Sequence, residues 1–256
     1  MSEDKNVPVA ETPMPQPLFY QKPEALNANR HGDLRLRQTA DFAFARKTNS
    51  LAITASEFAA VARNFPIVFV GDEHYPAAVL GLDTENLFVD ETGKWAENAY
   101  VPAYVRRYPF AFIAFDEGKQ FALGVDRACP RFVTNEEDES LPLFSEGKPT
   151  RITDEAMRFC IAFQNDHGVT KTFVKALVDQ NLLVEVQYAA TTAVGKYISL
   201  KGFQVVDASR FQNLPDAVVL DWHRKGWLGL VQFHLASQDH WRLLNARQAA
   251  ALALAA

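Results

Sequence analysis

The strongest constraint on the fold of this chain is a series of short apolar runs between residues 65 and 125, bounded by Gly, Asp and Asn. The runs lie at 66–70, 77–82, 87–90, 110–115 and 121–125. Runs of this length with turn residues between them are typical of β-strands. Connections of a few residues permit antiparallel hairpins, whereas a parallel crossover needs about a dozen residues or more. The sequence therefore predicts a central antiparallel, meander-like sheet over about residues 65–125.

Helical spacing of apolar residues dominates the second half of the chain. It predicts one helix that opens at Thr153 and ends at Gly168, a second over 169–182, short helices over 208–214 and 216–225, and a long helix over about 227–248. His234 lies on the apolar side of that last helix, where a hydrogen-bonded core histidine is expected. An earlier helix is capped by Thr54 or Ser56 and runs to about Asn64. The predicted class is α+β, with C-terminal helices covering one face of the sheet.

Further strands are predicted outside the central region. Alternating Leu and Arg residues predict a strand over 34–37, and residues 196–207 predict another with a bulge at Gly202. Residues 18–20 are expected to form a short edge strand. The long segment 128–150 contains the acidic residues 136–139 and is expected to be a solvated loop, with a lid or docking arm as the alternative.

The ends of the chain suggest the domain boundaries. Residues 1–17 are polar and Pro-rich, so we expect a disordered tail, followed by a single α+β domain over 18–248 and an Ala-rich tail over 249–256. The first 17 residues lack the apolar centre of a secretion signal, which favours a cytoplasmic location and leaves signal-less export open. No apolar run approaches the roughly 20 residues that a membrane helix needs, so membrane insertion is not expected.

Composition and motifs exclude several classes of function. The net charge of −5 argues against a general nucleic-acid binder. The two cysteines, Cys129 and Cys160, have neither the number nor the spacing of a disulfide framework or a zinc site. The sequence lacks the G-x-S-x-G, P-loop, G-x-G-x-x-G and H-E-x-x-H motifs. No cofactor is therefore expected, and nothing in the motifs favours an enzyme.

The candidate binding segment is Asn98–Phe115, which contains six aromatic residues and the adjacent Arg106 and Arg107. If Pro102 begins a helical turn, then Tyr100, Tyr104 and Tyr108 repeat every four residues and form a column beside the arginines. Aromatic anchors with guanidinium groups predict a site for an extended peptide or an anionic group.

A structural explanation of the same segment stays open. The rings then fill the junction between sheet and helices, and the arginines pair with acidic residues such as Asp90 and Glu91. A strand over 110–115 that begins after Pro109 supports this explanation for the second half of the segment.

A weaker candidate is a metal site. His31-x-Asp33 resembles the first two ligands of a two-histidine, one-carboxylate iron site, and His74 is a candidate third ligand. The alternative is that His31 and Asp33 shape a turn before a strand.

Five blocks of sequence resemble the bacterial SapC family: RHGDLRLR (30–37), FARKTNSLAITASEF (44–58), FPIVFVG (65–71), NLFVDETGKW (86–95) and YVPAYVRRYPFAF (100–112). The resemblance covers roughly residues 18–247. It implies an association with a surface layer, and members are often encoded near TonB-dependent receptors. The family offers no established catalytic residues, and it is distinct from the peptide-transporter permease of the same name.

Three functions are compatible with these observations. The first is a soluble, non-enzymatic accessory protein of a surface-layer or TonB-dependent system, which recognises a protein or peptide partner through residues 100–112. The second is an enzyme that modifies a peptide or small molecule, with iron bound through His31 and Asp33. The third is a structural subunit of a surface assembly.

Overall fold

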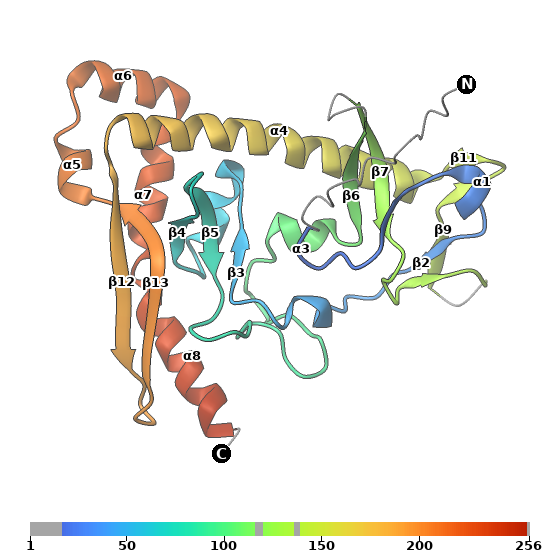
Figure 1. The fold of residues 1–256 in the computed structure, drawn as a ribbon, viewed down its shortest axis with the longest axis horizontal. Helices are drawn as coiled ribbons and strands as arrows, with labels where there is room; N and C mark the ends of the chain where they lie inside the picture. Colours follow the sequence, from blue (N-terminus) through green and yellow to red (C-terminus); the bar gives the residue numbers. More distant parts are fainter. Residues whose placement is uncertain (1–16, 116–119, 136–138, 255–256) are drawn as a thin grey trace, which may run out of the picture.

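The computed structural model describes residues 17–115, 120–135 and 139–254. It shows a mixed α+β fold with several antiparallel sheets and a group of C-terminal helices (Figure 1), which confirms the fold class expected from the sequence. The acidic residues 136–138 and most of the N-terminal tail lie outside the described residues.

The largest sheet has five strands and a buried central strand. Its order is β12 (Leu183–Thr191), β13 (Tyr197–Val206), β4 (Ile67–Val70), β5 (Tyr75–Val79) and β3 (Ser50–Ala52), all antiparallel. Three of the four β4 residues are buried, as expected for an apolar strand covered on both faces. The core around it contains Phe58, Phe65 and Phe173, all fully buried.

A second sheet has three strands in the order β1 (Pro23–Ala25), β7 (Gln120–Asp126) and β6 (Phe110–Phe115). The predicted region 65–125 is thus divided between two sheets: its first two strands lie in the five-stranded sheet and its last two in this one. The physical reason is the connection after β5, which runs to Pro102 and is long enough to separate the hairpins. Residues 87–90, predicted as a strand, contribute only the isolated bridge Val89–Trp95.

The segment predicted as an irregular loop contains short strands. A three-stranded sheet has the order β8 (Phe132–Val133), β2 (Arg35–Arg37) and β9 (Ser140–Pro142), and a hairpin joins β10 (Phe144–Ser145) to β11 (Lys148–Pro149). In β2 the alternation predicted from the sequence is observed, because Leu36 is buried between two half-buried arginines. Residues 18–20 form a turn and not the expected edge strand. The edge strand near the start of the chain is β1.

A single helix, α4 (Arg151–Asp179), spans both sheets (Figure 1). The prediction of two helices separated at Gly168 is therefore wrong. A mid-helix glycine costs only about 1 kcal/mol relative to Ala, and the apolar face continues past it through Thr170, Phe173 and Leu177, all buried. With 29 residues the helix is roughly 44 Å long.

The remaining helices are short near the N-terminus and clustered at the C-terminus. They are α1 (Ala28–His31), two 3-10 turns (Ala43–Ala45 and Ala55–Glu57), α2 (Phe58–Val61), α3 (Ala103–Arg107), α5 (Ala208–Gln212), α6 (Asp216–Lys225), α7 (Trp227–Ser237) and α8 (His240–Leu254). The long helix predicted over 227–248 is two helices, broken at Gln238 and Asp239. At the break, Ser237 accepts a hydrogen bond from the Ile67 N–H and Gln238 donates one to the Ile67 carbonyl, which anchors the junction to β4. Helix α8 includes residues 249–254 of the Ala-rich end.

Strand β12 was missed by the sequence analysis, whereas the bulge at Gly202 is confirmed. Between the β12–β13 pairs Val186–Phe203 and Tyr188–Leu200, one residue of β12 faces two of β13. Gly202 has a φ of 79°, a conformation that glycine adopts without steric cost. Within the described residues, no helix is long and apolar enough to cross a membrane.

Candidate functional site

The predicted helical turn after Pro102 is α3, and a buried carboxylate holds its start. Glu57 is only 4% exposed, and its Oε1 accepts a hydrogen bond of 2.6 Å from the Ala103 N–H. Its Oε2 accepts one of 2.8 Å from the Thr54 N–H. A carboxylate at a helix start satisfies free N–H groups and interacts favourably with the helix dipole. Glu57 thus ties the candidate segment to the 3-10 turn at residues 55–57.

The three tyrosines are anchored separately and do not form a column. The Tyr100 hydroxyl donates to Glu57 Oε1 (3.1 Å), that of Tyr104 to the Leu18 carbonyl (3.2 Å) and that of Tyr108 to Asp126 Oδ2 (3.0 Å). Burial raises the pKa of each hydroxyl. These tyrosines are therefore protonated framework residues.

Arg106 is exposed and is held by its own segment. Its Nε donates to the Val101 carbonyl (3.0 Å) and its Nη2 to the Tyr100 hydroxyl (2.9 Å), which in turn donates to Glu57. The guanidinium lies 5.3 Å from the centre of the Phe159 ring on α4. Glu57 therefore offsets part of the Arg106 charge through one intervening hydroxyl.

Arg107 is held mainly by aromatic rings. Its guanidinium carbon lies 4.5 Å from the ring centre of Phe163 and 4.8 Å from that of Tyr104. The Nε atom is buried without a hydrogen-bond acceptor. Within the described part of the chain, no carboxylate oxygen lies within 4.0 Å of the guanidinium of Arg106 or Arg107. Arg107 thus carries a positive charge that no ion pair neutralises within the described residues.

The alternative partners named from the sequence are engaged elsewhere. Glu91 pairs with Arg46 at 3.8 Å, and Asp90 accepts hydrogen bonds from Thr92 and Lys94. The structural explanation is therefore half right. The rings do fill the junction between α3, α4 and the N-terminal residues, but the arginines do not form the expected ion pairs.

The two arginines line a hollow of about 250 Å³ between α3 and the first half of α4, which we call the arginine hollow. Its positive side chains are Arg106, Arg107 and Arg131, against one carboxylate, that of Glu155. The remaining lining residues are Leu36, Gln38, Tyr108, Pro109, Phe110, Ile152, Ala156, Phe159 and Cys160. Burial raises the pKa of the Cys160 thiol to about 11, and the nearby Arg107 opposes this effect. An excess of guanidinium groups over an apolar floor is chemically suited to an anionic group on an otherwise apolar chain.

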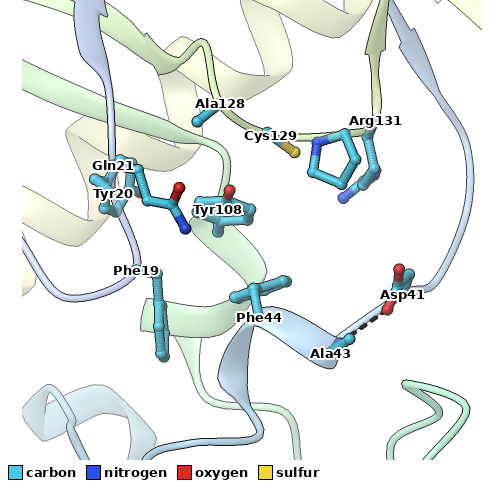
Figure 2. A pocket seen from close by; sticks show the side chains of 11 residues that line it. Phe19, Tyr20, Gln21, Asp41, Ala43, Phe44, Tyr108, Ala128, Cys129 and Arg131 are labelled. Atoms are coloured by element: carbon cyan, nitrogen blue, oxygen red, sulfur yellow. Dashed lines mark hydrogen bonds between the residues drawn. The ribbon is translucent and has the colours of Figure 1, made fainter.

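A larger hollow of about 410 Å³ lies on the other side of Tyr108, and we call it the aromatic hollow (Figure 2). Phe19, Tyr20, Phe44 and Tyr108 form its aromatic wall, and Asp41 and Arg131 lie across from them. Tyr108 and Arg131 line both hollows. Of the residues in this wall, only Tyr108 was predicted from the sequence as a site residue.

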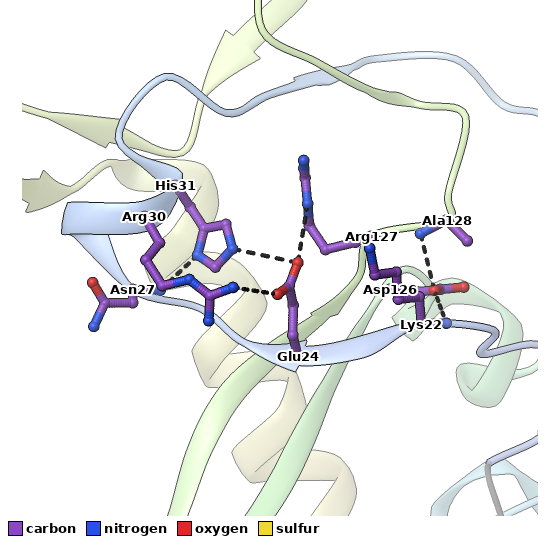
Figure 3. Close-up of polar contacts among 8 residues, drawn as sticks. All are labelled: Lys22, Glu24, Asn27, Arg30, His31, Asp126, Arg127 and Ala128. Carbon is purple, nitrogen blue, oxygen red and sulfur yellow. Dashed lines mark hydrogen bonds and ion pairs between the residues drawn. The ribbon is translucent and has the colours of Figure 1, made fainter.

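Asp126 anchors the wall between the two hollows. This carboxylate is fully buried and accepts hydrogen bonds from the N–H groups of Gln21, Lys22 and Ala128 and from the Tyr108 hydroxyl. Figure 3 shows Asp126 between Lys22 and Ala128. Three sequence segments therefore meet at one carboxylate, which no local motif signals.

The candidate metal ligands are not brought together. The His31 Nδ1 accepts a hydrogen bond from the Asn27 N–H (3.0 Å), and its Nε2 lies 3.5 Å from Glu24, which also pairs with Arg30 and Arg127 (Figure 3). Asp33 is exposed on the turn before β2, and His74 lies on the turn between β4 and β5. The described residues contain no group of three His, Cys, Asp or Glu side chains that could hold a metal ion.

Comparison with known proteins gives one family assignment. No curated protein and no solved structure matches the chain. The SapC family model matches residues 26–244, which includes every element from α1 to α7 and both hollows except for residues 19–21. The chain therefore belongs to the SapC family.

Proposed function

We propose that this protein is a non-enzymatic binding protein that recognises an anionic stretch of a protein or peptide partner through Arg106 and Arg107. In this proposal Tyr100 and Tyr104 hold the two guanidinium groups, and Tyr108 lines the hollow beside them. The observation that carries the proposal is the guanidinium of Arg107, which lines the arginine hollow, forms no ion pair within the described residues and has a buried Nε–H without an acceptor there. A desolvated charged donor without a hydrogen-bond acceptor raises the free energy of the folded protein, and a ligand carboxylate that binds the guanidinium lowers it again.

The surroundings of the arginines favour a peptide over a small free anion. Phe159, Ile152 and Ala156 provide apolar area next to the charges, and a second hollow of about 260 Å³ continues on the other side of Arg106 and Phe159. An extended chain with an acidic residue and apolar neighbours matches this alternation of charge and apolar surface. As the family resemblance implies, the partner belongs to a surface-layer or TonB-dependent outer-membrane system.

The test measures binding of fluorescent octapeptides of alternating Ala and Glu, with Ala and Gln as the uncharged comparison. The informative variant is Arg107→Met, because the Met side chain retains the apolar stem against Tyr104 and Phe163 and removes the charge. Loss of a charged hydrogen bond weakens binding roughly 10- to 100-fold.

The matched control is Arg158→Met, which removes an exposed positive charge from α4 outside the arginine hollow. The proposal predicts that the control binds like the unmodified protein and that only the acidic peptide is bound tightly. Equal binding of the acidic and amide peptides, or equal weakening by both substitutions, would show that the hollow does not recognise the anion.

A further inference from the structure

The aromatic hollow has the size of a small-molecule site and a preformed wall. Its volume of about 410 Å³ lies within the range of roughly 300–1,000 Å³ found for ligand pockets. The Phe44 and Tyr108 ring centres are 4.2 Å apart, and those of Phe19 and Phe44 are 5.2 Å apart. The hydroxyls of Tyr108 and Tyr20 are tied to Asp126 and to the Phe110 carbonyl, so the wall needs little ordering when a ligand binds.

The opposite side of the hollow carries one charge of each sign (Figure 2). The Asp41 Oδ1 accepts a hydrogen bond from the Ala43 N–H (2.8 Å), which fixes the carboxylate at the rim. The Nε and Nη2 of Arg131 donate to the Arg37 carbonyl at 3.3 and 3.2 Å, which holds the guanidinium in place. Neither side chain forms an ion pair within the described parts of the chain.

From this arrangement we infer that the aromatic hollow binds a free aromatic amino acid. The ligand ring packs against Phe19, Phe44 and Tyr108, where paired aromatic rings gain energy beyond simple burial. Its ammonium group lies by the Asp41 carboxylate and its carboxylate by the Arg131 guanidinium. In such a zwitterion the ammonium and carboxylate share one carbon atom and the ring projects away from them, which suits a hollow with an aromatic wall on one side and one charge of each sign on the other. A purely apolar ligand leaves both charges unused.

The aromatic hollow shares Tyr108 and Arg131 with the arginine hollow, but its other lining residues differ, so the two proposals can fail separately. Arg106 and Arg107 do not line the aromatic hollow, and Asp41 and Ala128 do not line the arginine hollow. The Arg107→Met variant is therefore expected to bind the amino acid normally, and variants at Asp41 and Ala128 are expected to bind the acidic peptide normally.

The test titrates the full-length protein with L-phenylalanine and L-tryptophan and follows saturation-transfer NMR signals of the ligand. N-acetyl-phenylalaninamide supplies the ring without charges, and L-leucine supplies the charges without a ring. Ala128→Trp fills the hollow from its exposed rim and should abolish binding, while Ala246→Trp, at an exposed position of α8, is the matched control. Asp41→Asn retains the acceptor for the Ala43 N–H and should weaken binding about tenfold or more through loss of the charge.

Protection of Cys129 gives an independent readout, because this thiol lines the aromatic hollow whereas Cys160 lines the arginine hollow. Bound L-phenylalanine should slow modification of Cys129 by methyl methanethiosulfonate and leave Cys160 unaffected. Saturable binding of both aromatic amino acids that is lost in Ala128→Trp supports the inference. Absence of saturable binding, equal binding of the acetylated amide or of leucine, or unchanged binding in Ala128→Trp would overturn it.

Discussion

His234 should make this fold sensitive to mild acid. The side chain is 0% exposed on α7, and its Nε2 accepts a hydrogen bond of 3.0 Å from the Val206 N–H. The neutral ring therefore carries its proton on Nδ1, and a second proton would have to displace the bond to Val206. Burial lowers the pKa of His234 from 6.5 to about 3.

The sign and size of the effect follow from the difference between the folded and unfolded states. Between pH 6.5 and pH 3 the unfolded chain binds a proton at this position and the folded chain does not, so stability is lost as the pH falls through that window. Because pH 5 lies about 1.5 pH units below the ordinary pKa, the loss attributable to His234 at pH 5 is about 2 kcal/mol.

The assay is urea unfolding at pH 7, 6 and 5, followed by tryptophan fluorescence and circular dichroism, for the unmodified protein and for His234→Gln. The Gln side chain retains an acceptor for the Val206 N–H and does not titrate. Only the pH dependence is compared, because loss of the ring that packs 5.1 Å from Phe69 lowers stability at every pH. The variant should lose about 2 kcal/mol less than the unmodified protein between pH 7 and pH 5. Parallel pH profiles of the free energy of unfolding for the two proteins would show that His234 does not cause the loss of stability in acid.

Three further predictions concern other buried groups. Asp126→Ala removes an acceptor shared by four donors, so it should lower the free energy of unfolding by at least about 3 kcal/mol in urea titrations. A loss below about 1 kcal/mol would contradict the anchoring role of Asp126. Phe173→Ala removes a fully buried ring in contact with Phe58 and Trp227, so it should lower the free energy of unfolding by about 3–5 kcal/mol. Lys175→Ala, at an exposed ion pair of the same helix, should lower it by less than about 0.5 kcal/mol. Because its pKa is about 11, Cys160 should react with iodoacetamide at pH 8 roughly 100-fold more slowly than a free thiol. Mass-spectrometric time courses measure this rate, and modification at the rate of free cysteine would contradict the burial of Cys160.

The elements that the sequence predicted well are those with strong local signals. The sequence predicts a helix start capped by Thr54 or Ser56, and the capping box at Thr54 confirms the first of these. The Leu–Arg alternation around Leu36 predicts β2. Gly202 signals the bulge in β13. Local patterns failed where long-range contacts decide the outcome: Gly168 does not end α4 because the apolar face on both sides of it is buried. The assignment of the central strands to two sheets depends on pairing between distant segments, such as β1 with β7, which no local pattern specifies.

The candidate site was predicted in part. The sequence located the arginines and the helical turn after Pro102, but it did not signal Phe159 and Phe163, which lie more than 50 residues away and reach the arginines only because α4 packs on α3. The sequence predicted a cap at Thr54 or Ser56 but did not signal Glu57, whose hydrogen bond to the Ala103 N–H depends on tertiary contact. Likewise, the ion pairs expected with Asp90 and Glu91 rested on charge alone, and those side chains are held by nearer partners.

The proposed function depends on whether the guanidinium of Arg107, which forms no ion pair within the described residues, binds an anion from a partner. The most direct measurement is a ¹H–¹⁵N NMR spectrum of the arginine Nε–H groups during a titration with the alternating Ala–Glu octapeptide, with signals assigned by Arg107→Met and Arg158→Met. If Arg107 binds the carboxylates of the peptide, its Nε–H signal should shift saturably with the acidic peptide and not with the amide peptide. The Arg158 signal should not move with either. An Arg107 signal that stays in place at saturating peptide, or that shifts equally with both peptides, would show that Arg107 does not recognise the anion.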